Sequence, residues 1–288
     1  MGTLKLVSTN QQYKKYNYSY DNKTYIAGDI HVFTTSNKDV QSIAPAYSIQ
    51  KLPLSDMNPS PVSSSKVIAK TNGNVWNQGT GTSLGFFYQG PNYPLFVNGT
   101  AYSSANIIKE DNQMFEAWYY PNFCVKNDGS ATIRWFENPD SLKAALPYCR
   151  CIIGSFHPLV FNGKNIFTEK VYDAEPSGRL IMYPEGTSGG EITHFMESAG
   201  DPGANRYRTL LGHKKNSAGV YFMVSTDAQI TCKVAASFMK DLGCDYAVNM
   251  DGSDSVEMRI RDGYGANGKV TNKPTGRKIN TAVCAYEL

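Results

Sequence analysis

The segment that decides the fold begins with RTLLGHKKNSAGVYFMVS (208–225) and ends with YAVNMDGSDSVEMRI (246–260). The apolar runs at its two ends have the length of strands, and apolar residues between them recur on one helical face. We therefore predict the order strand, turn, strand, helix, strand and acidic loop. The helix is expected over Ile230 to Leu242, where Gly243 stands at the position of a C-terminal cap.

The composition indicates a globular protein that is rich in strands. The chain has 288 residues, of which 41% are hydrophobic and 12% aromatic, and its 19 Tyr residues favour strands. Strand signals outnumber helix signals, so the predicted class is α+β, with a sheet-rich mixed or antiparallel core and few helices. We predict a single domain over residues 1–288. Residues 1–25 are expected to form an N-terminal hairpin that packs on the body or extends as an arm.

Turn residues between alternating runs predict the other elements. Asn127-Asp128-Gly129 joins the two strands of a hairpin, and Pro139 to Leu146 is expected to be a short helix capped by Asn138. Residues 178–205 are rich in Gly and Pro and lack periodicity, so they are predicted to be irregular. The remaining expected strands lie within 13–34, 85–88, 151–164 and 281–286.

The charge and the cysteines limit the partners and the compartment. The net charge of +3 is spread along the chain, so no nucleic-acid partner is expected. No apolar run approaches a membrane-spanning length and the N-terminus lacks a signal-peptide core, so we expect no membrane insertion. The 6 Cys residues are then expected to be reduced and buried. The sequence gives no prediction of the oligomeric state.

Carboxylates cluster where the last apolar run ends. Asp251, Asp254 and Glu257 follow it closely, and Asn249 shares a strand face with Asp251 by alternation. Cleavage of a glycosidic bond commonly needs a protonated acid and a carboxylate, which such a cluster can supply. The alternative interpretation is an Asp-Gly-Ser turn with solvated acids.

Cations precede the same segment. Arg206 and Arg208 alternate and so share a face in an extended chain, and Arg is suited to bidentate binding of phosphate. His213 is a candidate proton donor or phosphate contact. The alternatives are a surface pair of Arg residues and a structural His.

Metal and cofactor motifs are lacking. No His pair has the HExxH spacing of a zinc site, so no metal is predicted. GYGANG (263–268) matches GxGxxG but is not followed by a helical pattern, which excludes a dinucleotide site. We expect no cofactor.

The motifs RTLLG (208–212) and NMDGSDS (249–255), separated by a strand and a helix ending in Leu-Gly, resemble the phosphodiester glycosidase domain family. The family pattern there is RTAIG followed by NLDGGGSS. Ser253 and Asp254 stand where the family has Gly, and Val256 where it has Ser. Further segments that resemble the family lie at 83–87 (its NGGFF, with Ser83 and Leu84 departing), 122–133, 152–164 and 277–284.

The resemblance implies hydrolysis of the bond between an anomeric carbon and phosphate in a glycosyl phosphodiester. Arg208 is expected to hold the phosphate, Asp251 to act as a carboxylate at the anomeric carbon and His213 to donate a proton or contact the phosphate. Substrates would be N-acetylglucosamine-1-phosphodiester-like, teichoic-acid-like or nucleotide-derived. The predicted substrate-binding residues are Arg206, Thr209, Asn249, Gly252, Ser253, Asp254 and Ser255.

Two other functions stay open. The altered loop and the Tyr-rich opening also suit a non-catalytic carbohydrate- or phosphate-binding module, for example on a phage particle. A third hypothesis is a protein that degrades or sequesters nucleotide signals. Convergence of Arg208, His213 and Asp251 on one pocket would favour the enzyme. Asp254 filling that pocket, or pairing with Arg208, would favour the binding module. The composition suits a bacterial or phage protein, and we expect a cytoplasmic or phage-associated location.

Overall fold

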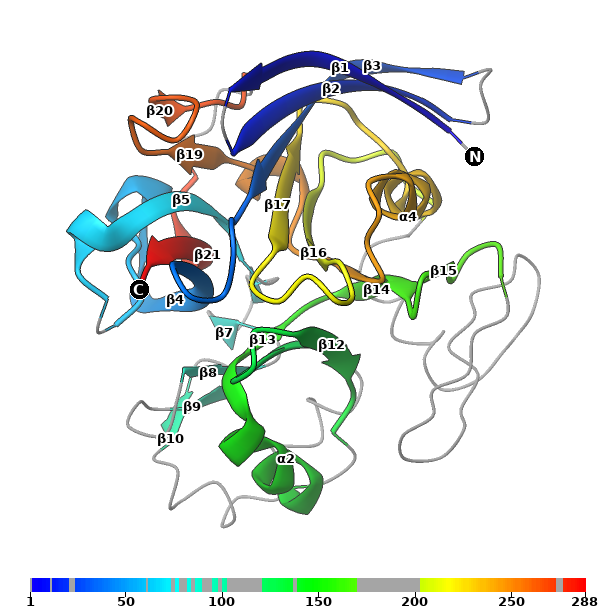
Figure 1. The fold of residues 1–288 in the computed structure, drawn as a ribbon. Coiled ribbons are helices and arrows are strands. Elements are labelled where there is room, and N and C mark those ends of the chain that lie inside the picture. The colour runs from blue at the N-terminus through cyan, green and yellow to red at the C-terminus, as the bar shows by residue number, and fades with distance from the viewer. Residues whose placement is uncertain are drawn as a thin grey trace.

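An eight-stranded sheet contains most of the segment that decides the fold, and its strand order is β1-β2-β3-β17-β16-β18-β14-β15 (Figure 1). The computed structural model describes residues 2–10, 12–20, 24–60, 62–73, 76–77, 82–83, 86–89, 95–97, 100–102, 121–136, 139–169, 203–272 and 277–288. The strands of this sheet are β1 (Thr3–Asn10), β2 (Tyr13–Tyr20), β3 (Thr24–Thr34), β14 (His157–Phe161), β15 (Lys164–Asn165), β16 (Thr209–His213), β17 (Tyr221–Thr226) and β18 (Tyr246–Asn249).

Two further sheets pack against the first. A five-stranded sheet has the order β20 (Gly268–Lys269), β19 (Met258–Ile260), β5 (Val67–Asn72), β21 (Ile279–Glu287), β4 (Gln41–Leu52). A six-stranded sheet has the order β10 (Thr100–Tyr102), β9 (Leu95–Val97), β8 (Phe86–Gln89), β13 (Cys149–Gly154), β11 (Asn122–Lys126), β12 (Ala131–Arg134). A two-stranded ribbon joins β6 (Trp76–Asn77) and β7 (Thr82–Ser83).

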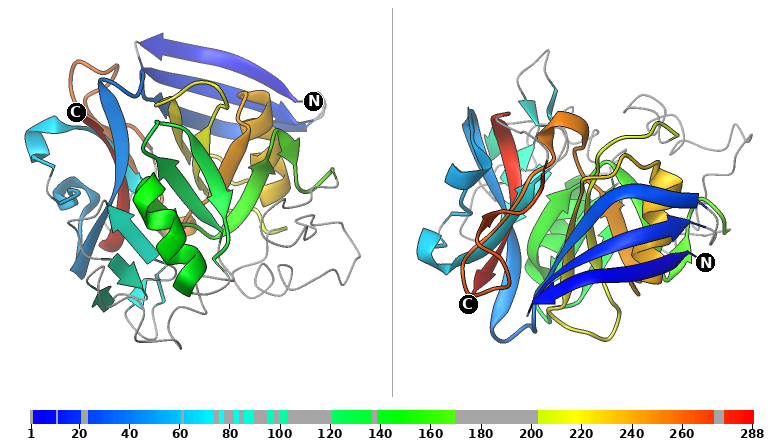
Figure 2. Two further views of the ribbon diagram at one scale, coloured as in Figure 1. Left: turned by 60° about the horizontal axis from the view of Figure 1, so that its bottom comes forward. Right: turned by 90° about the horizontal axis from the view of Figure 1, so that it is seen from above.

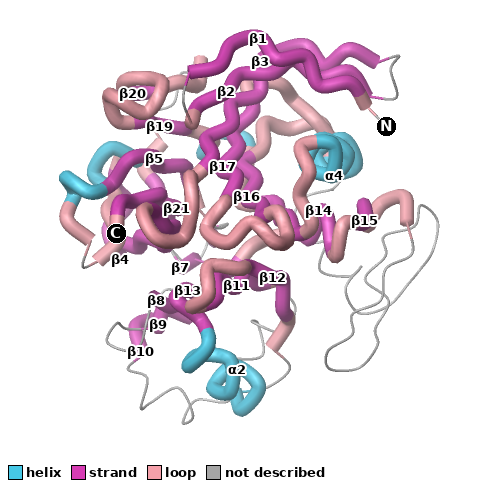
Figure 3. The backbone as a smooth tube through the Cα atoms, viewed as in Figure 1, coloured by secondary structure: helices cyan, strands magenta, loops and turns pink. Residues whose placement is uncertain are grey.

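Helices are few in the described part of the chain, as Figure 3 shows. The strand pairs in that part are antiparallel, which confirms the sheet-rich α+β class. The helices are α2 (Pro139–Ala145) and α4 (Cys232–Asp241), with 3-10 turns η1 (Leu54–Asp56), η2 (Ser64–Lys66), η3 (Leu146–Tyr148) and η4 (Ser253–Ser255).

The predicted order of the central segment is confirmed. β16 and β17 form a hairpin, α4 follows, and β18 returns beside β16. The hydroxyl of Thr231 accepts a hydrogen bond from the N–H of Val234 and so caps α4 at its N-terminus. Gly243 adopts φ +93° just beyond the helix, a conformation that favours glycine.

The N-terminal strands lie across α4 (Figure 2, right) and are part of the body. Tyr18 of β2 is fully buried, and its ring meets the ring of Phe238 edge to face at 5.3 Å. The Tyr18 hydroxyl donates a 2.9 Å hydrogen bond to Asp241 at the end of the helix. Burial of an aromatic side chain of this kind stabilises the fold by roughly 2–3 kcal/mol, so these strands cover α4 rather than extending as an arm.

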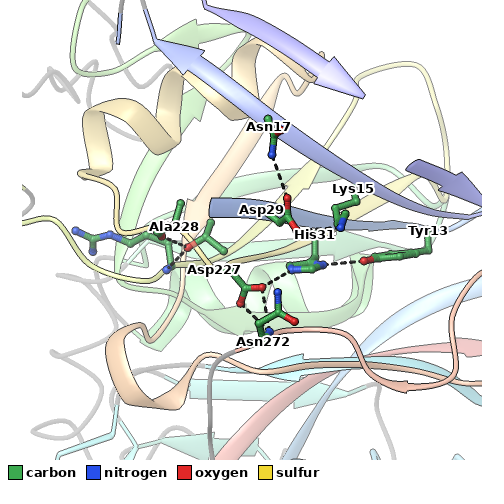
Figure 4. Close-up of polar contacts among 10 residues, drawn as sticks. Tyr13, Lys15, Asn17, Asp29, His31, Asp227, Ala228 and Asn272 are labelled. Carbon is green, nitrogen blue, oxygen red and sulfur yellow. Dashed lines mark hydrogen bonds and ion pairs between the residues drawn. The ribbon is translucent and has the colours of Figure 1, made fainter. Parts of the chain in front are cut away.

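A polar chain also connects the N-terminal strands to the centre (Figure 4). The Tyr13 hydroxyl lies 2.7 Å from the Nδ1 of His31, and the Nε2 of His31 lies 2.8 Å from the carboxylate of Asp227. Asp227 follows β17 and accepts hydrogen bonds from the N–H of Asn272. This chain therefore links β2, β3, β17 and the segment after β20.

Several local expectations are confirmed and one is refined. β11 and β12 form the predicted hairpin, and β13 and β14 are both strands. They belong to different sheets, however, because the chain crosses between sheets at Ser155 and Phe156. The six cysteines are free and buried, as expected. The expected cap Asn138 and most of the irregular 178–205 segment lie outside the described residues.

No described helix is both long enough and apolar enough to cross a membrane.

The cap of α4 gives a test of the fold. Replacing Thr231 with Ala removes the acceptor for the Val234 N–H, so the free energy of unfolding should fall by about 1 kcal/mol in urea titrations. Thr231→Ser keeps a hydroxyl oxygen and should stay close to the wild type. Equal stability of the Ala and Ser variants would contradict the capping role.

Candidate functional site

The buried side chain of Asn72, at the end of β5, fixes the loop that follows β18. Its Nδ2 donates a 2.7 Å hydrogen bond to the carbonyl of Asp251. Its Oδ1 accepts hydrogen bonds from the Thr209 hydroxyl of β16 at 2.5 Å and from the N–H of Glu257 at 3.4 Å. The N–H of Asp251 donates to the carbonyl of Gly73 at 2.9 Å. The position of Asp251 is thereby set relative to two sheets.

A narrow cleft with both signs of charge opens beside these contacts. Its walls are formed by Asn72, Gly73, Asp251, Ser255 and residues 277–281, which include the cations of Arg277 and Lys278. The cleft has a volume of about 10 Å³, which is room for roughly one water molecule. The side chain of Asp251 is partly exposed at this cleft.

Asp251 is electrostatically unusual. Burial raises the pKa of this carboxyl group to about 6. A hydrogen bond from Ser255, the positive charge of Arg277 and the N–H of Gly252 oppose this shift, and the charge of Asp254 adds to it. A carboxylate whose pKa is displaced by burial, next to a cation in a cleft, is typical of a functional site.

The backbone after Asp251 is tightly packed. A Cβ atom on Gly252 would lie 2.6 Å from the carbonyl oxygen of Tyr207, so only glycine fits there. Ser253 adopts φ +56°, in the left-handed region, and its N–H donates to the same Tyr207 carbonyl at 2.9 Å. The family pattern has Gly at position 253, which suits this conformation better than Ser.

The structure brings part of the predicted set together. Gly252, Ser253 and Ser255 lie in the loop with Asp251, and Ser255 contributes to the cleft. Thr209 is connected to this loop through Asn72. The Nη1 of Arg206 reaches the Ser253 hydroxyl at 3.5 Å, a weak contact.

Arg208 and Asn249 lie on the α4 face of the eight-stranded sheet. Two nitrogens of the Arg208 guanidinium donate to the carbonyls of Ile230, at 3.0 Å, and Ala204, at 2.8 Å. Asn249 is buried, with its Nδ2 3.4 Å from the Nδ1 of His157. Alternation explains this placement, because the side chain of Thr209 points to the other face. Neither Arg208 nor Asn249 is among the residues that line the Asp251 cleft.

His213 lies at the opposite end of β16. It pairs with Tyr246, where β18 begins, whereas Asp251 follows the end of β18. A strand rises about 3.3 Å per residue, so the side chains of His213 and Asp251 are separated by roughly 10 Å or more. Among the described residues, neither Arg208 nor His213 lines the cleft that contains Asp251, so the expected convergence of the three side chains is not seen there.

The two other carboxylates of the cluster have different surroundings. Glu257 is buried and accepts a 2.6 Å hydrogen bond from the Nε of Arg259. Asp254 is exposed, and it does not line the cleft, although its charge acts on Asp251. Among the described residues, neither Asp254 nor Glu257 therefore forms an acid pair with Asp251 in the cleft, and Asp254 does not fill the cleft.

Of the residues that line the cleft, only Asp251 and Ser255 were predicted, and the residues that sequence reasoning missed include Asn72, Gly73 and Arg277. An Asn-Gly pair that directly follows an apolar run was the available signal for the first two. Arg277 is the first residue of the segment 277–284, which resembles the family, and this resemblance was the available signal for it.

Among the described residues, no group of three or more His, Cys, Asp or Glu side chains could hold a metal ion.

Comparison with known proteins identifies the family. The family model described as phosphodiester glycosidase matches residues 65–286. This match covers most of the chain, so the protein belongs to the phosphodiester glycosidase family. A search of curated protein sequences gave no match.

Two solved structures share the fold. The catalytic domain of zebrafish N-acetylglucosamine-1-phosphodiester alpha-N-acetylglucosaminidase, auto-inhibited by its pro-peptide, is similar with a TM-score of 0.56 and 16% identity, over 100% of this chain and 88% of that chain. A hypothetical protein from Synechocystis is similar with a TM-score of 0.53 and 13% identity, over 99% of this chain and 64% of that chain. At these identities the likeness establishes the fold alone.

The buried charge of Asp251 predicts a pH-dependent stability. The unfolded chain releases this proton near the ordinary pKa of 3.8, and the folded chain near 6. The wild type therefore loses stability as the pH rises between these values, and Asp251→Asn should be more stable by about 1–2 kcal/mol at pH 7.5. The advantage should shrink as the pH falls to 4. Urea titrations across this range measure it, with the exposed Asp262→Asn as the control. A constant difference between wild type and Asp251→Asn would contradict the assignment.

The loop gives a paired test of backbone packing. Gly252→Ala places a Cβ against the Tyr207 carbonyl and should lower the free energy of unfolding by about 1–3 kcal/mol. Ser253→Gly relieves the left-handed backbone and should be neutral or stabilising by up to about 1 kcal/mol. Thermal unfolding of both variants checks this. A destabilised Ser253→Gly together with a wild-type-like Gly252→Ala would contradict the described loop.

Proposed function

We propose that the protein hydrolyses the bond between the anomeric carbon of a sugar and phosphate in a glycosyl phosphodiester. The observation that carries the proposal is that one cleft contains the Asp251 carboxyl group and the cation of Arg277. A carboxylate stabilises positive charge that develops at an anomeric carbon, and a guanidinium group binds phosphate oxygens. Membership of the phosphodiester glycosidase family supports this reaction class.

In the proposed reaction, the oxygen of a water molecule forms a bond to the anomeric carbon. The bond from that carbon to the bridging oxygen breaks, and its electron pair passes to the phosphate. The proton released by water ends on the phosphomonoester or in solvent. A phosphomonoester is a fair leaving group, so the site needs one carboxylate and no strong general acid. Asp251 then acts in its ionised form, either by activating the water or by stabilising the transition state.

The proposal assigns the phosphate to Arg277, which differs from the expectation for Arg208. Arg277 lines the cleft and its charge acts on Asp251. Two nitrogens of Arg208 bind backbone carbonyls instead, so we assign Arg208 a positioning role for the segment that leads into β16. Ser255 positions Asp251 through its hydrogen bond. We assign no role in this step to His213, because β16 separates it from the cleft.

The substrate classes considered are N-acetylglucosamine-1-phosphodiesters, teichoic-acid-like polymers and nucleotide-derived sugars. The narrow cleft accommodates the bond to be cleaved at its mouth, so the sugar and the group beyond the phosphate lie on the surrounding surface. Such a site suits a substrate that is extended on both sides of the phosphate.

Turnover of a panel of sugar-1-phosphodiesters, with UDP-N-acetylglucosamine included, tests this function. Asp251→Asn should lower kcat/KM by about 10³-fold or more, and Arg277→Gln by about 10²-fold. Lys278→Gln, a neighbouring cation in the same cleft, is the matched control and should change kcat/KM by less than about tenfold. Wild-type kcat/KM should rise with pH to a plateau above about 6, because the ionised carboxylate is the active form.

Arg208→Gln separates the two assignments of the phosphate. A positioning role predicts a smaller loss than for Arg277→Gln, together with a lower unfolding temperature. Turnover that survives both Asp251→Asn and Arg277→Gln would overturn the proposed site.

A second candidate function is a non-catalytic binding module for sugar phosphates. The observation that favours it is the altered loop, in which Ser253 adopts a left-handed φ of +56° and the exposed Asp254 acts on Asp251, at two positions where the family pattern has Gly. The same panel distinguishes the two functions. Saturable binding without turnover of any member would favour the binding module.

A further inference from the structure

A second and larger pocket lies at the far end of β16 from the Asp251 cleft. It is formed between the β11–β12 hairpin and the turn that joins β16 to β17, which lie side by side in Figure 1. Its volume of about 340 Å³ is in the range of small-molecule sites. Its polar lining includes Lys126, Asp128, Ser130, His213, Lys215 and Tyr246.

Hydrogen bonds hold the two turns together, so the pocket is built into the fold. The carbonyl of Gly129 accepts from the N–H of Gly219 at 2.7 Å and from the hydroxyl of Tyr221 at 2.8 Å. The carboxylate of Asp245 accepts from the N–H of Lys215 at 2.7 Å. Both rims of the pocket are therefore held in place by hydrogen bonds to neighbouring elements of the fold.

His213 forms the polar floor of this pocket. It is 1% exposed, and its Nδ1 lies 3.0 Å from the carbonyl oxygen of Val220. A carbonyl oxygen only accepts, so Nδ1 carries the proton, and in the neutral ring Nε2 is an acceptor. Burial lowers the pKa of His213, which favours this neutral form. Among the described residues Nε2 has no hydrogen-bond partner, so a ligand hydroxyl in the pocket can donate to it.

The rim supplies charge and a ring face. Lys126 and Lys215 are exposed, one on each side of the pocket, and both can approach an anionic group. Asp128 accepts from the N–H and hydroxyl of Ser130 and keeps acceptor capacity for a second hydroxyl. The partly buried ring of Tyr246 offers an apolar surface. Two cations, hydroxyl acceptors and a ring face together suit an anionic polyol.

We propose that this pocket is a second binding site, which takes a phosphorylated sugar unit. The phosphate lies between Lys126 and Lys215, and the sugar hydroxyls donate to His213 and Asp128. The site is independent of Asp251, because it lies at the opposite end of β16 and β18. The ligand is a free sugar phosphate or one unit of a sugar-phosphate polymer, which share this chemistry.

Calorimetric titration with glucose 6-phosphate tests the site on the full chain. The wild type should bind glucose 6-phosphate with a Kd in the micromolar to millimolar range, and this Kd should rise with salt concentration. Glucose should bind at least about tenfold more weakly. Lys126→Glu and Lys215→Glu should each raise the Kd for glucose 6-phosphate by about tenfold or more. Lys143→Glu, a charge reversal on an exposed lysine of α2, should leave the Kd within about twofold.

Asp251→Asn separates this proposal from the proposed function. Binding of glucose 6-phosphate should be unchanged in that variant, and in the wild type it should shift the NMR signals of the His213 ring. Three results would each overturn the proposal. They are equal binding by the Lys126, Lys215 and Lys143 variants, no shift of the His213 signals, and no binding by the wild type at roughly 10 mM glucose 6-phosphate. Loss of binding in Asp251→Asn would place the ligand at the other cleft and would also overturn it.

Discussion

The side chain of Asn72 is the contact on which the candidate site depends. It binds the Thr209 hydroxyl, the Asp251 carbonyl and the N–H of Glu257, and so joins β5, β16 and the loop after β18. Each such bond contributes about 1 kcal/mol, but a buried partner left unsatisfied costs about 1–3 kcal/mol. Three groups lose their partner when Asn72 is lost, which makes this residue a constraint on the whole loop. Two sheets thereby hold a carboxylate that neither could hold alone.

The same arrangement requires the protein to bury a carboxyl group that ionises reluctantly. Burial raises the pKa of Asp251 to about 6, and Ser255, Arg277 and the N–H of Gly252 only partly offset it. The ionised form therefore costs stability at neutral pH. Sites for chemistry commonly carry such a cost, because a group adjusted for reaction is rarely adjusted for stability.

Local features of the fold could be predicted from the sequence, because they depend on periodicity and turn chemistry. The β16–β17 hairpin, α4 with Gly243 beyond its end, and the β11–β12 hairpin are of this kind. The strands β13 and β14 were also predictable, but their separation into different sheets was not, because strand pairing is set by long-range packing.

The candidate site was predictable only in part, because some of its residues are close in the sequence and others are brought together by long-range packing. The loop around Asp251 could be found from its polar residues and its family resemblance. Alternation along β16 then sends Arg208 and Thr209 to opposite faces, and the length of β16 removes His213 from the cleft. Arg277, about twenty-five residues further along the chain, reaches Asp251 only through tertiary folding. Proximity in the sequence was therefore a poor guide to membership of the site.

The central claim is that the bond to the anomeric carbon is broken, with Asp251 acting on the sugar side. Hydrolysis of a sugar-1-phosphodiester in water labelled with ¹⁸O, followed by mass spectrometry of both products, tests it most directly. The account predicts that the label appears in the free sugar, because water attacks carbon. Label in the phosphomonoester would show attack at phosphorus and would contradict the account.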